Sequence, residues 1–346
     1  MYSYLKDFEM DKKNILLTGG GGTVGFEVLK QLTGLSDKYT TTVFDVFSKV
    51  NRKKFASLNN NFSIVYGDIT QKEAVRKVCR NIDVVIHLAA IIPPLADEKP
   101  ELAYKVNVEG TKNLLDSLQE LSPDAFFMYS SSISVYGDRL TEPAIKVGDA
   151  LQPSEADYYA ETKIACEDLI KQTRLDWTIF RLAAIMGNHK ISKLMFHMPL
   201  ATSLEIATPA DAARAFVNGI EQRPALNKSI FNLGGGEKNR TTFREFLHRS
   251  FDVFGLGKAD FPEKTFAEKN FHCGYYADGA DLENIVHFRK DTLDTYFEDV
   301  KKNVNPFVRI LTKSFAGFIK KQLVKKSEPL AAMRSKDEKL ISRFFH

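Results

Sequence analysis

Short apolar runs alternate with helical stretches up to about residue 235 of the chain. A strand that is buried on both faces has a continuous apolar run, so this pattern predicts a parallel sheet with helices on both sides. The predicted strands are residues 14–20, 41–46, 62–68, 82–90, 125–132, 177–183 and 229–235. The predicted helices between them include residues 26–32, 72–79, 101–121 and 154–172.

The rest of the chain predicts a smaller lobe. Residues 187–208 have the composition of a loop, and residues 235–300 are rich in helical patterns and turns. Such a lobe could lean over the carboxyl edge of the sheet, where open α/β sheets bind ligands. We therefore predict an α/β fold with a Rossmann-like, doubly wound parallel sheet and a small C-terminal substrate lobe. The predicted units are a nucleotide-binding domain of residues 1–186 and 206–234, a substrate lobe of residues 187–205 and 235–303, and a tail of residues 304–346.

The first predicted strand runs into a glycine-rich turn, TGGGGTVG, which a helical stretch follows. Glycine tolerates positive φ and lets the backbone approach a pyrophosphate, while the free amides of the next helix attract phosphate. Three glycines spaced three residues apart between a strand and a helix predict a dinucleotide site. The residues expected there are Gly19, Gly22, Thr23, Val24 and Gly25.

Asp45 ends the second predicted strand. A carboxylate at this position accepts hydrogen bonds from the ribose 2′-hydroxyl and repels a 2′-phosphate, so the predicted cofactor is NAD. Arg52 and Lys53 follow and could meet a 2′-phosphate, which leaves NADP open.

Tyr159 and Lys163 stand one helical turn apart in YYAETK. Free tyrosine has a pKa near 10, and a nearby ammonium group is expected to lower it. Tyr159 could then exchange a proton with a substrate hydroxyl or carbonyl while a hydride moves to or from the nicotinamide. A serine hydroxyl from residues 130–132, at the end of the fifth predicted strand, could hydrogen-bond the reacting oxygen.

Together these motifs resemble the extended short-chain dehydrogenase/reductases, and within them the NAD-dependent epimerase/dehydratase family that includes UDP-glucose 4-epimerase. The resemblance covers about residues 14–297. It rests on motifs in the family's order, which are TGGGGTVG, Asp45, GDIT, HLAA, NVEGTKNLL, SSSISVYG, YYAETK and TPADAARA.

The resemblance implies roles for residues that the motifs contain. Ser132 is implied as the catalytic serine, Tyr159 as the acid/base, and Lys163 as the residue that holds the nicotinamide ribose. The residues implied near the cofactor are Asp68 and Ile69 at the adenine, Leu88, Ala89 and Ala90 along it, and Asn107, whose role is structural. It also implies a homodimer whose four-helix bundle contains residues 101–121 and 155–172.

Two departures from the family bear on the substrate. Ile133 and Ser134 stand where the 4,6-dehydratases carry acids, so the elimination of water lacks its groups. The segment between Gly187 and TPADAARA is short for a nucleotide-gripping insert, so a free sugar, sugar acid or other hydroxy compound competes with a sugar nucleotide. Ser132, Ile133, His189 and His197 are the candidate substrate-binding residues.

Charge and cysteine content limit the alternatives. The net charge of +4 arises from residues 304–346, which hold ten Lys/Arg and three Asp/Glu, so a nucleic acid is not expected on the body. The cysteines Cys79, Cys166 and Cys273 lack C-x-x-C spacing, so neither a disulfide framework nor a metal site is expected. No long apolar span or signal peptide is evident, so a cytoplasmic location is predicted.

The tail places five apolar side chains at helical spacing among lysines and arginines, which are Phe307, Leu311, Phe315, Phe318 and Ile319. We expect a helix that packs on the body or on a dimer mate, and the alternative is a helix lying on an anionic membrane surface.

The predicted function is an NAD-dependent epimerase or dehydrogenase acting on a sugar, a sugar nucleotide or a similar secondary alcohol. The alternatives are an NAD(P)-dependent reductase of a non-sugar carbonyl compound and a non-catalytic dinucleotide-binding module, since a fold does not decide a function. The presence of Ser132, Tyr159 and Lys163 favours an enzyme.

Overall fold

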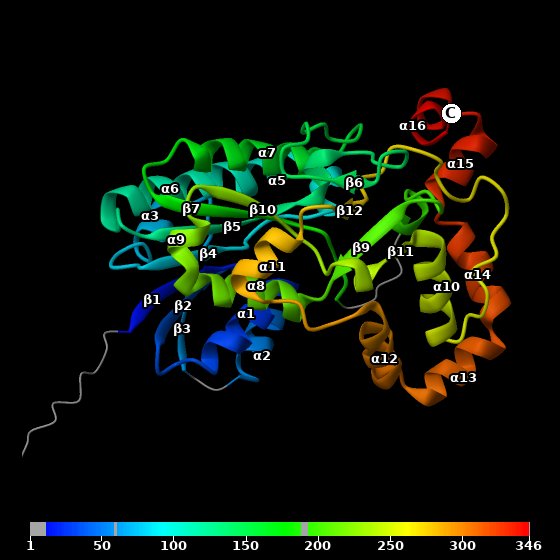
Figure 1. The fold of residues 1–346 in the computed structure, drawn as a ribbon. Helices are drawn as coiled ribbons and strands as arrows, with labels where there is room; N and C mark the ends of the chain where they lie inside the picture. The colour runs from blue at the N-terminus through cyan, green and yellow to red at the C-terminus, as the bar shows by residue number, and fades with distance from the viewer. Residues whose placement is uncertain (1–11, 59–60, 188–192, 346) are drawn as a thin grey trace, which may run out of the picture.

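A computed structural model describes residues 12–58, 61–187 and 193–345 of the chain. Among these residues, a seven-stranded parallel sheet has the order β10-β7-β5-β4-β1-β2-β3 (Figure 1). Its strands are β1 (Lys13–Thr18), β2 (Tyr39–Asp45), β3 (Phe62–Tyr66), β4 (Val84–His87), β5 (Phe126–Ser132), β7 (Asp176–Leu182) and β10 (Ser229–Leu233). All seven were predicted as strands. The strand order reverses beside β1, so the carboxyl ends of β1 and β4 form the switch point where such sheets bind ligands.

Side chains of each strand alternate between two cores, one on either face of the sheet. In β1, Ile15 and Leu17 belong to one core, and Leu16 belongs to the other. The first face is covered by α1 (Thr23–Thr33), α2 (Lys49–Phe55), α8 (Pro209–Gly219) and α11 (Ala280–Val286). The second face is covered by α3 (Lys72–Arg76), α6 (Gly110–Leu121) and α7 (Tyr158–Lys171). The predicted doubly wound fold is therefore confirmed.

The connection from β4 to α6 contains α4 (Leu95–Glu98), α5 (Pro100–Tyr104) and a π-helical turn, η1 (Lys105–Glu109). Single 3₁₀ turns follow β5 and α8, at η2 (Ile133–Tyr136) and η4 (Ile220–Gln222), and α9 (Arg223–Leu226) leads into β10. The helix predicted over residues 101–121 is thus present as the consecutive elements α5, η1 and α6.

The smaller lobe combines short strands with helices. Its strands are β8 (Ala184–Ile185), β9 (Ser203–Ala207) and β11 (Arg240–Thr242) in one sheet, and β6 (Ala144–Ile145) and β12 (Tyr275–Tyr276) in another. Its helical elements are η3 (Lys193–Phe196), η5 (Glu237–Asn239), α10 (Phe243–Val253) and α12 (Leu293–Asn303). The prediction of loop throughout residues 187–208 was wrong at β9, because β8 and β11, from either side in the chain, pair with it.

One boundary also differs from the predicted units. Residues 280–288 lie in the stretch assigned to the substrate lobe, but Leu282, Val286 and Phe288 pack in the core of the large sheet. The cause is α11, whose apolar side chains pack against α8 and β10.

The tail forms α13 (Pro306–Ser314), α14 (Ala316–Val324), α15 (Glu328–Ser335) and α16 (Glu338–Phe344), drawn in orange and red in Figure 1. Leu323, Leu330 and Phe344 are buried, whereas α13 buries none of its side chains. The expected packing on the body thus holds for the later tail helices and not for α13. Among the described helices, none combines the length and the apolar character needed to cross a membrane.

Candidate active site

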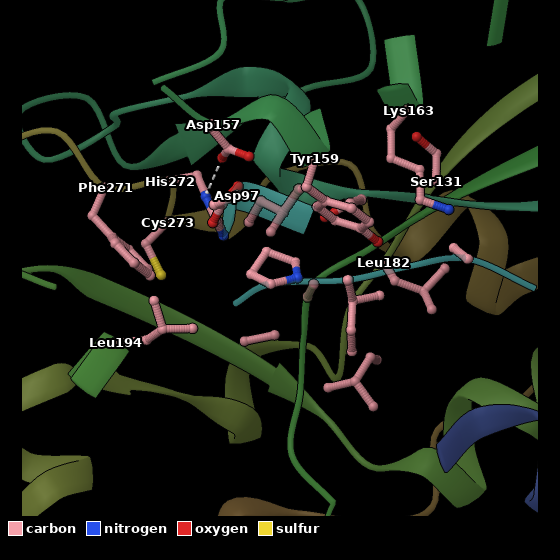
Figure 2. Close-up of a pocket in the computed structure, with 18 of the residues that line it drawn as sticks. Asp97, Ser131, Asp157, Tyr159, Lys163, Leu182, Leu194, Phe271, His272 and Cys273 are labelled. Carbon is pink, nitrogen blue, oxygen red and sulfur yellow. Dashed lines mark hydrogen bonds and ion pairs between the residues drawn. The ribbon is translucent and has the colours of Figure 1, made fainter. Parts of the chain in front are cut away.

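A cleft of about 720 Å³ lies at the carboxyl ends of the central strands, between the large sheet and the smaller lobe. Its floor is the glycine turn, and its walls come from the ends of β4, β5 and β7, the start of α7 and residues 182–187. The lobe contributes residues 270–273, and the tail contributes Arg343 and Phe344. Figure 2 shows side chains from both units pointing into this one space.

The glycine turn has the close-packed backbone that a dinucleotide requires. Gly19 has a φ of +72°, a conformation that favours glycine, and a Cβ there would lie 2.6 Å from the Ala89 amide nitrogen. A Cβ on Gly25 would lie 2.1 Å from the Gly19 carbonyl oxygen. Gly22 caps α1, and no side chain among the described residues occupies that cap. The first amides of α1 are thus available to an anion in the cleft, as predicted for Gly19, Gly22, Thr23, Val24 and Gly25.

Asp45 lies beside the turn at the end of β2. Its carboxylate accepts hydrogen bonds from the amides of Gly21 and Val46, both at 2.7 Å. Burial raises the pKa of Asp45, and these two amides and Lys54 oppose the rise. The Lys54 Nζ donates to the Gly21 carbonyl at 2.8 Å, and Lys54 lines the cleft.

The basic residue nearest the predicted ribose site is therefore Lys54, which the sequence analysis missed. Arg52 and Lys53, which it named instead, are exposed, and neither appears on the described lining of the cleft. The helical phase of α2 decides this, because Lys54 is on the face of α2 that turns toward the glycine turn.

The other predicted cofactor residues fall into two groups. Leu88 and Ala90 line the cleft after β4, and the Ala89 backbone packs against Gly19. Asp68 is exposed at the end of β3, and Ile69 is buried against Gly110. Neither Asp68 nor Ile69 belongs to the described lining of the cleft.

Asn107 holds the loop that follows β4. Its side chain accepts a hydrogen bond from the Ile91 amide at 2.7 Å and donates to the Ile91 carbonyl and to the Thr162 hydroxyl, both at 3.0 Å. These contacts join the loop to α7 and agree with a structural role.

Ser132, Tyr159 and Lys163 come together at the centre of the cleft. Ser132 ends β5, and its side chain hydrogen-bonds the Tyr159 hydroxyl. Lys163 is buried one turn further along α7, where its Nζ donates to the Ser130 carbonyl at 2.7 Å. The Nζ lies 5.5 Å from the centroid of the Tyr159 ring and 4.7 Å from that of Tyr129. The three residues predicted from scattered motifs thus form one constellation.

Burial dominates the electrostatics of this pair. Burial raises the pKa of Tyr159, the negative charge of Asp157 adds to the rise, and the hydrogen bond from Ser132 opposes it. The expected lowering of the Tyr159 pKa was wrong for the protein alone, because the phenolate is poorly solvated in this site. Burial also lowers the pKa of Lys163 to about 8, so its charge is sensitive to its surroundings.

The buried ion pair of Glu167 and Arg181 lies next to the constellation of Ser132, Tyr159 and Lys163. Glu167, one turn after Lys163, accepts from the Ser131 hydroxyl at 2.6 Å and from Arg181 at 2.9 and 2.7 Å. The Arg181 Nη1 also donates to the Tyr136 hydroxyl at 2.7 Å. The pair thereby joins α7 to β5 and β7, the elements that carry the reactive side chains.

His87 has a structural role. Its two ring nitrogens lie 2.6 Å from the Thr18 hydroxyl and 2.8 Å from the Thr111 hydroxyl. Burial lowers the pKa of His87 to about 3, so the ring is neutral at physiological pH.

The structure adds a second polar cluster that the motifs did not indicate. The Asp157 carboxylate caps α7 through the Ala160 amide at 2.9 Å and binds the His272 Nδ1 at 2.7 Å, the dashed line in Figure 2. Asp97 lies beside this pair and accepts a hydrogen bond from the Tyr159 amide. Burial and the charge of Asp157 raise the pKa of Asp97. The position of Asp157 just before YYAETK is an N-cap signal, but nothing local links it to Asp97 or His272.

Asp97 also has one buried oxygen, Oδ1, without a hydrogen-bond partner among the described residues. Its carboxyl lies on the cleft wall next to Tyr159. The cleft therefore contains an acid near the reacting centre, although the acids of the dehydratase motif are absent at Ile133 and Ser134.

Three of the four candidate substrate residues, Ser132, Ile133 and His197, line the cleft. Ile133 is buried and lines the cleft. His197 lines it as well, with its Nε2 2.9 Å from the Glu328 carboxylate and its ring centroid 5.0 Å from that of Phe344. His189 lies outside the described residues. The presence of Arg343 and Phe344 in the cleft was not predicted, because the tail reaches it only by folding back over the lobe.

Comparisons with known proteins agree with this fold. Residues 16–178 match the 3-beta hydroxysteroid dehydrogenase/isomerase family. The uncharacterized protein y4nG of Sinorhizobium fredii is 32% identical over 179 residues, which are 51% of this chain and 42% of that protein. The chain thus spans about two fifths of the length of this curated relative.

Solved structures resemble the chain over most of its length. UDP-glucuronic acid 4-epimerase from Bacillus cereus, in complex with UDP-glucuronic acid and NAD, has a TM-score of 0.70 at 19% identity, and the match covers 86% of this chain and 99% of that one. The dTDP-glucose 4,6-dehydratase DesIV from Streptomyces venezuelae, with NAD bound, has a TM-score of 0.67 at 21% identity, covering 84% and 96%. The family match and the shared fold confirm the predicted resemblance to the extended short-chain dehydrogenase/reductases.

Proposed function

We propose that this chain, an extended short-chain dehydrogenase/reductase, binds NAD and transfers a hydride to or from a secondary alcohol, with Tyr159 as the acid/base. The observation that carries the proposal is the meeting of Ser132, Tyr159 and Lys163 in the same cleft as the glycine turn. A purely structural role would not require a buried lysine one turn from a half-buried tyrosine at the end of a nucleotide site.

The residues present fit a dinucleotide. The close approach at Gly19 and Gly25 leaves no room for side chains, and the amides of α1 face the cleft. The neighbouring Asp45 carboxylate suits a ribose hydroxyl and disfavours a 2′-phosphate. The Lys54 ammonium already donates to the Gly21 carbonyl, so it would have to leave this contact to neutralise a 2′-phosphate. These features support NAD over NADP.

The chain's own residues can carry out the proton transfer. The nicotinamide of a bound NAD supplies the hydride acceptor or donor. Tyr159, held by Ser132, takes the hydroxyl proton as the alcohol becomes a carbonyl, and returns it to the carbonyl oxygen in the reverse reaction. The Lys163 ammonium stabilises the Tyr159 phenolate that accepts this proton, and the hydrogen bond of Lys163 to the Ser130 carbonyl fixes the position of the ammonium group.

The outcome for the substrate depends on the fate of the reduced cofactor. In an epimerase the cofactor stays bound and the hydride returns to the other face of the same carbon. In a dehydrogenase the reduced cofactor would leave, and in a reductase the oxidised cofactor would leave. The substrates to be compared are sugar nucleotides, sugar acids and smaller hydroxy compounds, the classes that the short segment after Gly187 leaves open.

The first experiment is to denature the purified chain and identify any released nicotinamide cofactor by mass spectrometry. Stoichiometric NAD favours an epimerase, and an empty protein that binds NADH reversibly favours a dehydrogenase or reductase. A protein without affinity for either NAD or NADP would contradict the proposal and favour a non-catalytic module.

The Tyr159→Phe variant tests the assigned chemistry. We expect turnover of any substrate found in the comparison to fall at least about 100-fold, the usual scale of general acid–base catalysis, while NADH affinity stays unchanged. Unchanged turnover would remove Tyr159 from the mechanism.

We also propose that the chain forms a homodimer through α5, α6 and α7. These helices lie side by side, and α5 exposes Leu102 and Tyr104 (Figure 1). Light scattering of the purified chain should give twice the monomer mass, and Leu102→Glu should halve it. A monomer at all concentrations would refute this arrangement.

A further inference from the structure

The apolar face of α13 and the start of α14 is the largest group of exposed apolar side chains in the described tail. We call it the tail face, and it consists of Phe307, Val308, Ile310, Leu311, Phe315 and Phe318. The exposed fraction of these residues lies between 55% and 78%. Single exposed apolar residues are ordinary, but six within twelve residues of two consecutive helices indicate an interaction site.

The body holds the tail face in a fixed orientation. On the opposite side of α14, Leu323 is buried and Ile319 packs with it in the core of the lobe. The Lys320 Nζ donates to the Lys258 carbonyl at 3.0 Å, and the Arg309 Nη2 donates to the Asp252 carbonyl at 3.4 Å. The helices are thus anchored by one side, and the other side faces solvent at the edge of the molecule (Figure 1).

The tail segment that carries this face has charges of a single sign, and Asp260 of the body lies 3.9 Å from the Lys320 Nζ. From Val304 to Lys326 the sequence contains six lysines and arginines and no aspartate or glutamate. Of these, Lys313, Lys321, Lys325 and Lys326 are exposed. An amphipathic surface that combines bulky apolar side chains with exposed lysines suits an anionic bilayer, where the apolar side chains enter the interface and the lysines meet the headgroups.

We propose that the tail face docks on an anionic lipid bilayer, so that the protein is held peripherally at a membrane surface. A second copy of the chain is a poorer occupant. A two-fold contact through this face would place one all-basic segment against another, with no acidic residue from Val304 to Lys326 to compensate. The proposal is independent of the catalytic assignment, because none of the tail-face residues lines the cleft.

The test is sedimentation of the full chain with vesicles. One set consists of phosphatidylcholine alone, and the other contains phosphatidylcholine with phosphatidylserine. We expect at least tenfold stronger binding to the anionic vesicles, weakening as salt is raised. We also expect Phe307→Ser combined with Phe318→Ser to reduce binding at least tenfold, and Lys313→Glu combined with Lys321→Glu to remove the preference for anionic vesicles.

Val50→Ser is the matched control, since Val50 is 66% exposed on α2, far from the tail face in Figure 1. It should bind vesicles like the parent chain, and NADH affinity should be the same in all variants. Equal binding to both vesicle types, or unchanged binding of the double phenylalanine variant, would overturn the proposal. So would a dimer that Phe307→Ser converts to a monomer, because a second copy would then cover the face.

Discussion

The glycine turn allows a graded test of how a single methyl group affects dinucleotide binding. A Cβ on Gly148 would meet nothing within 4 Å, a Cβ on Gly22 would lie 3.2 Å from the Gly19 carbonyl oxygen, and a Cβ on Gly25 would lie 2.1 Å from the same atom. Alanine therefore adds the same methyl group at each position, where it makes no contact at Gly148, a tight contact at Gly22 and a steric clash at Gly25.

The size of the effect follows from the displacement that each contact requires. Ordinary van der Waals contact begins at 3.4 Å, so Gly25→Ala forces two backbone segments apart by about 1.3 Å. Such a shift removes at least one hydrogen bond between an amide and a charged phosphate, which contributes about 1.5–3 kcal/mol. The dissociation constant for NADH should rise roughly 10- to 150-fold. Gly22→Ala needs a backbone displacement of only a few tenths of an ångström, so the dissociation constant for NADH should rise less than about tenfold.

The assay is a fluorescence titration with NADH, accompanied by thermal unfolding of each variant. Alanine is the better helix former by up to about 1 kcal/mol, so Gly25→Ala need not lose stability in proportion to its loss of affinity. Gly148→Ala should match the parent chain in both measurements. Equal NADH affinity for Gly25→Ala and the parent would refute the placement of the pyrophosphate at this turn.

Three further predictions concern buried groups. The pKa of Lys163 falls from 10.5 to about 8 on folding, so the unfolded chain binds more protons between these values and stability rises with pH across that window. The free energy of unfolding of Lys163→Met should accordingly exceed that of the parent by roughly 3 kcal/mol at pH 7, and most of this difference should be lost near pH 10. Urea unfolding at both pH values measures it. A difference that stays constant with pH would contradict the prediction. Glu167→Gln leaves the Arg181 guanidinium buried without its counter-charge and should cost about 3–5 kcal/mol of unfolding free energy, whereas an unchanged urea midpoint would show that the pair is dispensable. Phe344→Ala should lower the free energy of unfolding by about 3 kcal/mol and speed tryptic cleavage of α16, without weakening NADH binding. An unchanged cleavage rate would mean that other contacts hold α16 in place.

The fold followed closely from local patterns. Continuous apolar runs predicted all seven strands of the large sheet, because the central strands are buried on both faces and the edge strands β3 and β10 still carry apolar side chains. The short strands β6, β8, β9, β11 and β12 were not predicted. They are two to five residues long and form only because distant segments pair with them, so no periodicity marks them in advance.

The residues of the candidate site also fall into those that local spacing predicted and those that it did not. Gly19, Gly25, Tyr159 and Lys163 were predicted because glycine spacing and helical spacing are local properties of the chain. Lys54 was missed by one residue, because the rotation of α2 about its axis depends on what its apolar face packs against.

The chain's sequence by itself determined the sheet, the dinucleotide turn and the tyrosine–lysine pair, since each depends on residues within one or two helical turns of one another. The tertiary structure alone decided which groups surround them. It brought Asp97, Asp157 and His272 together beside Tyr159, placed Arg343 in the cleft and left the tail face exposed. It also reversed the expected pKa shift of Tyr159, because the cost of burying a charge depends on how completely the folded chain excludes water.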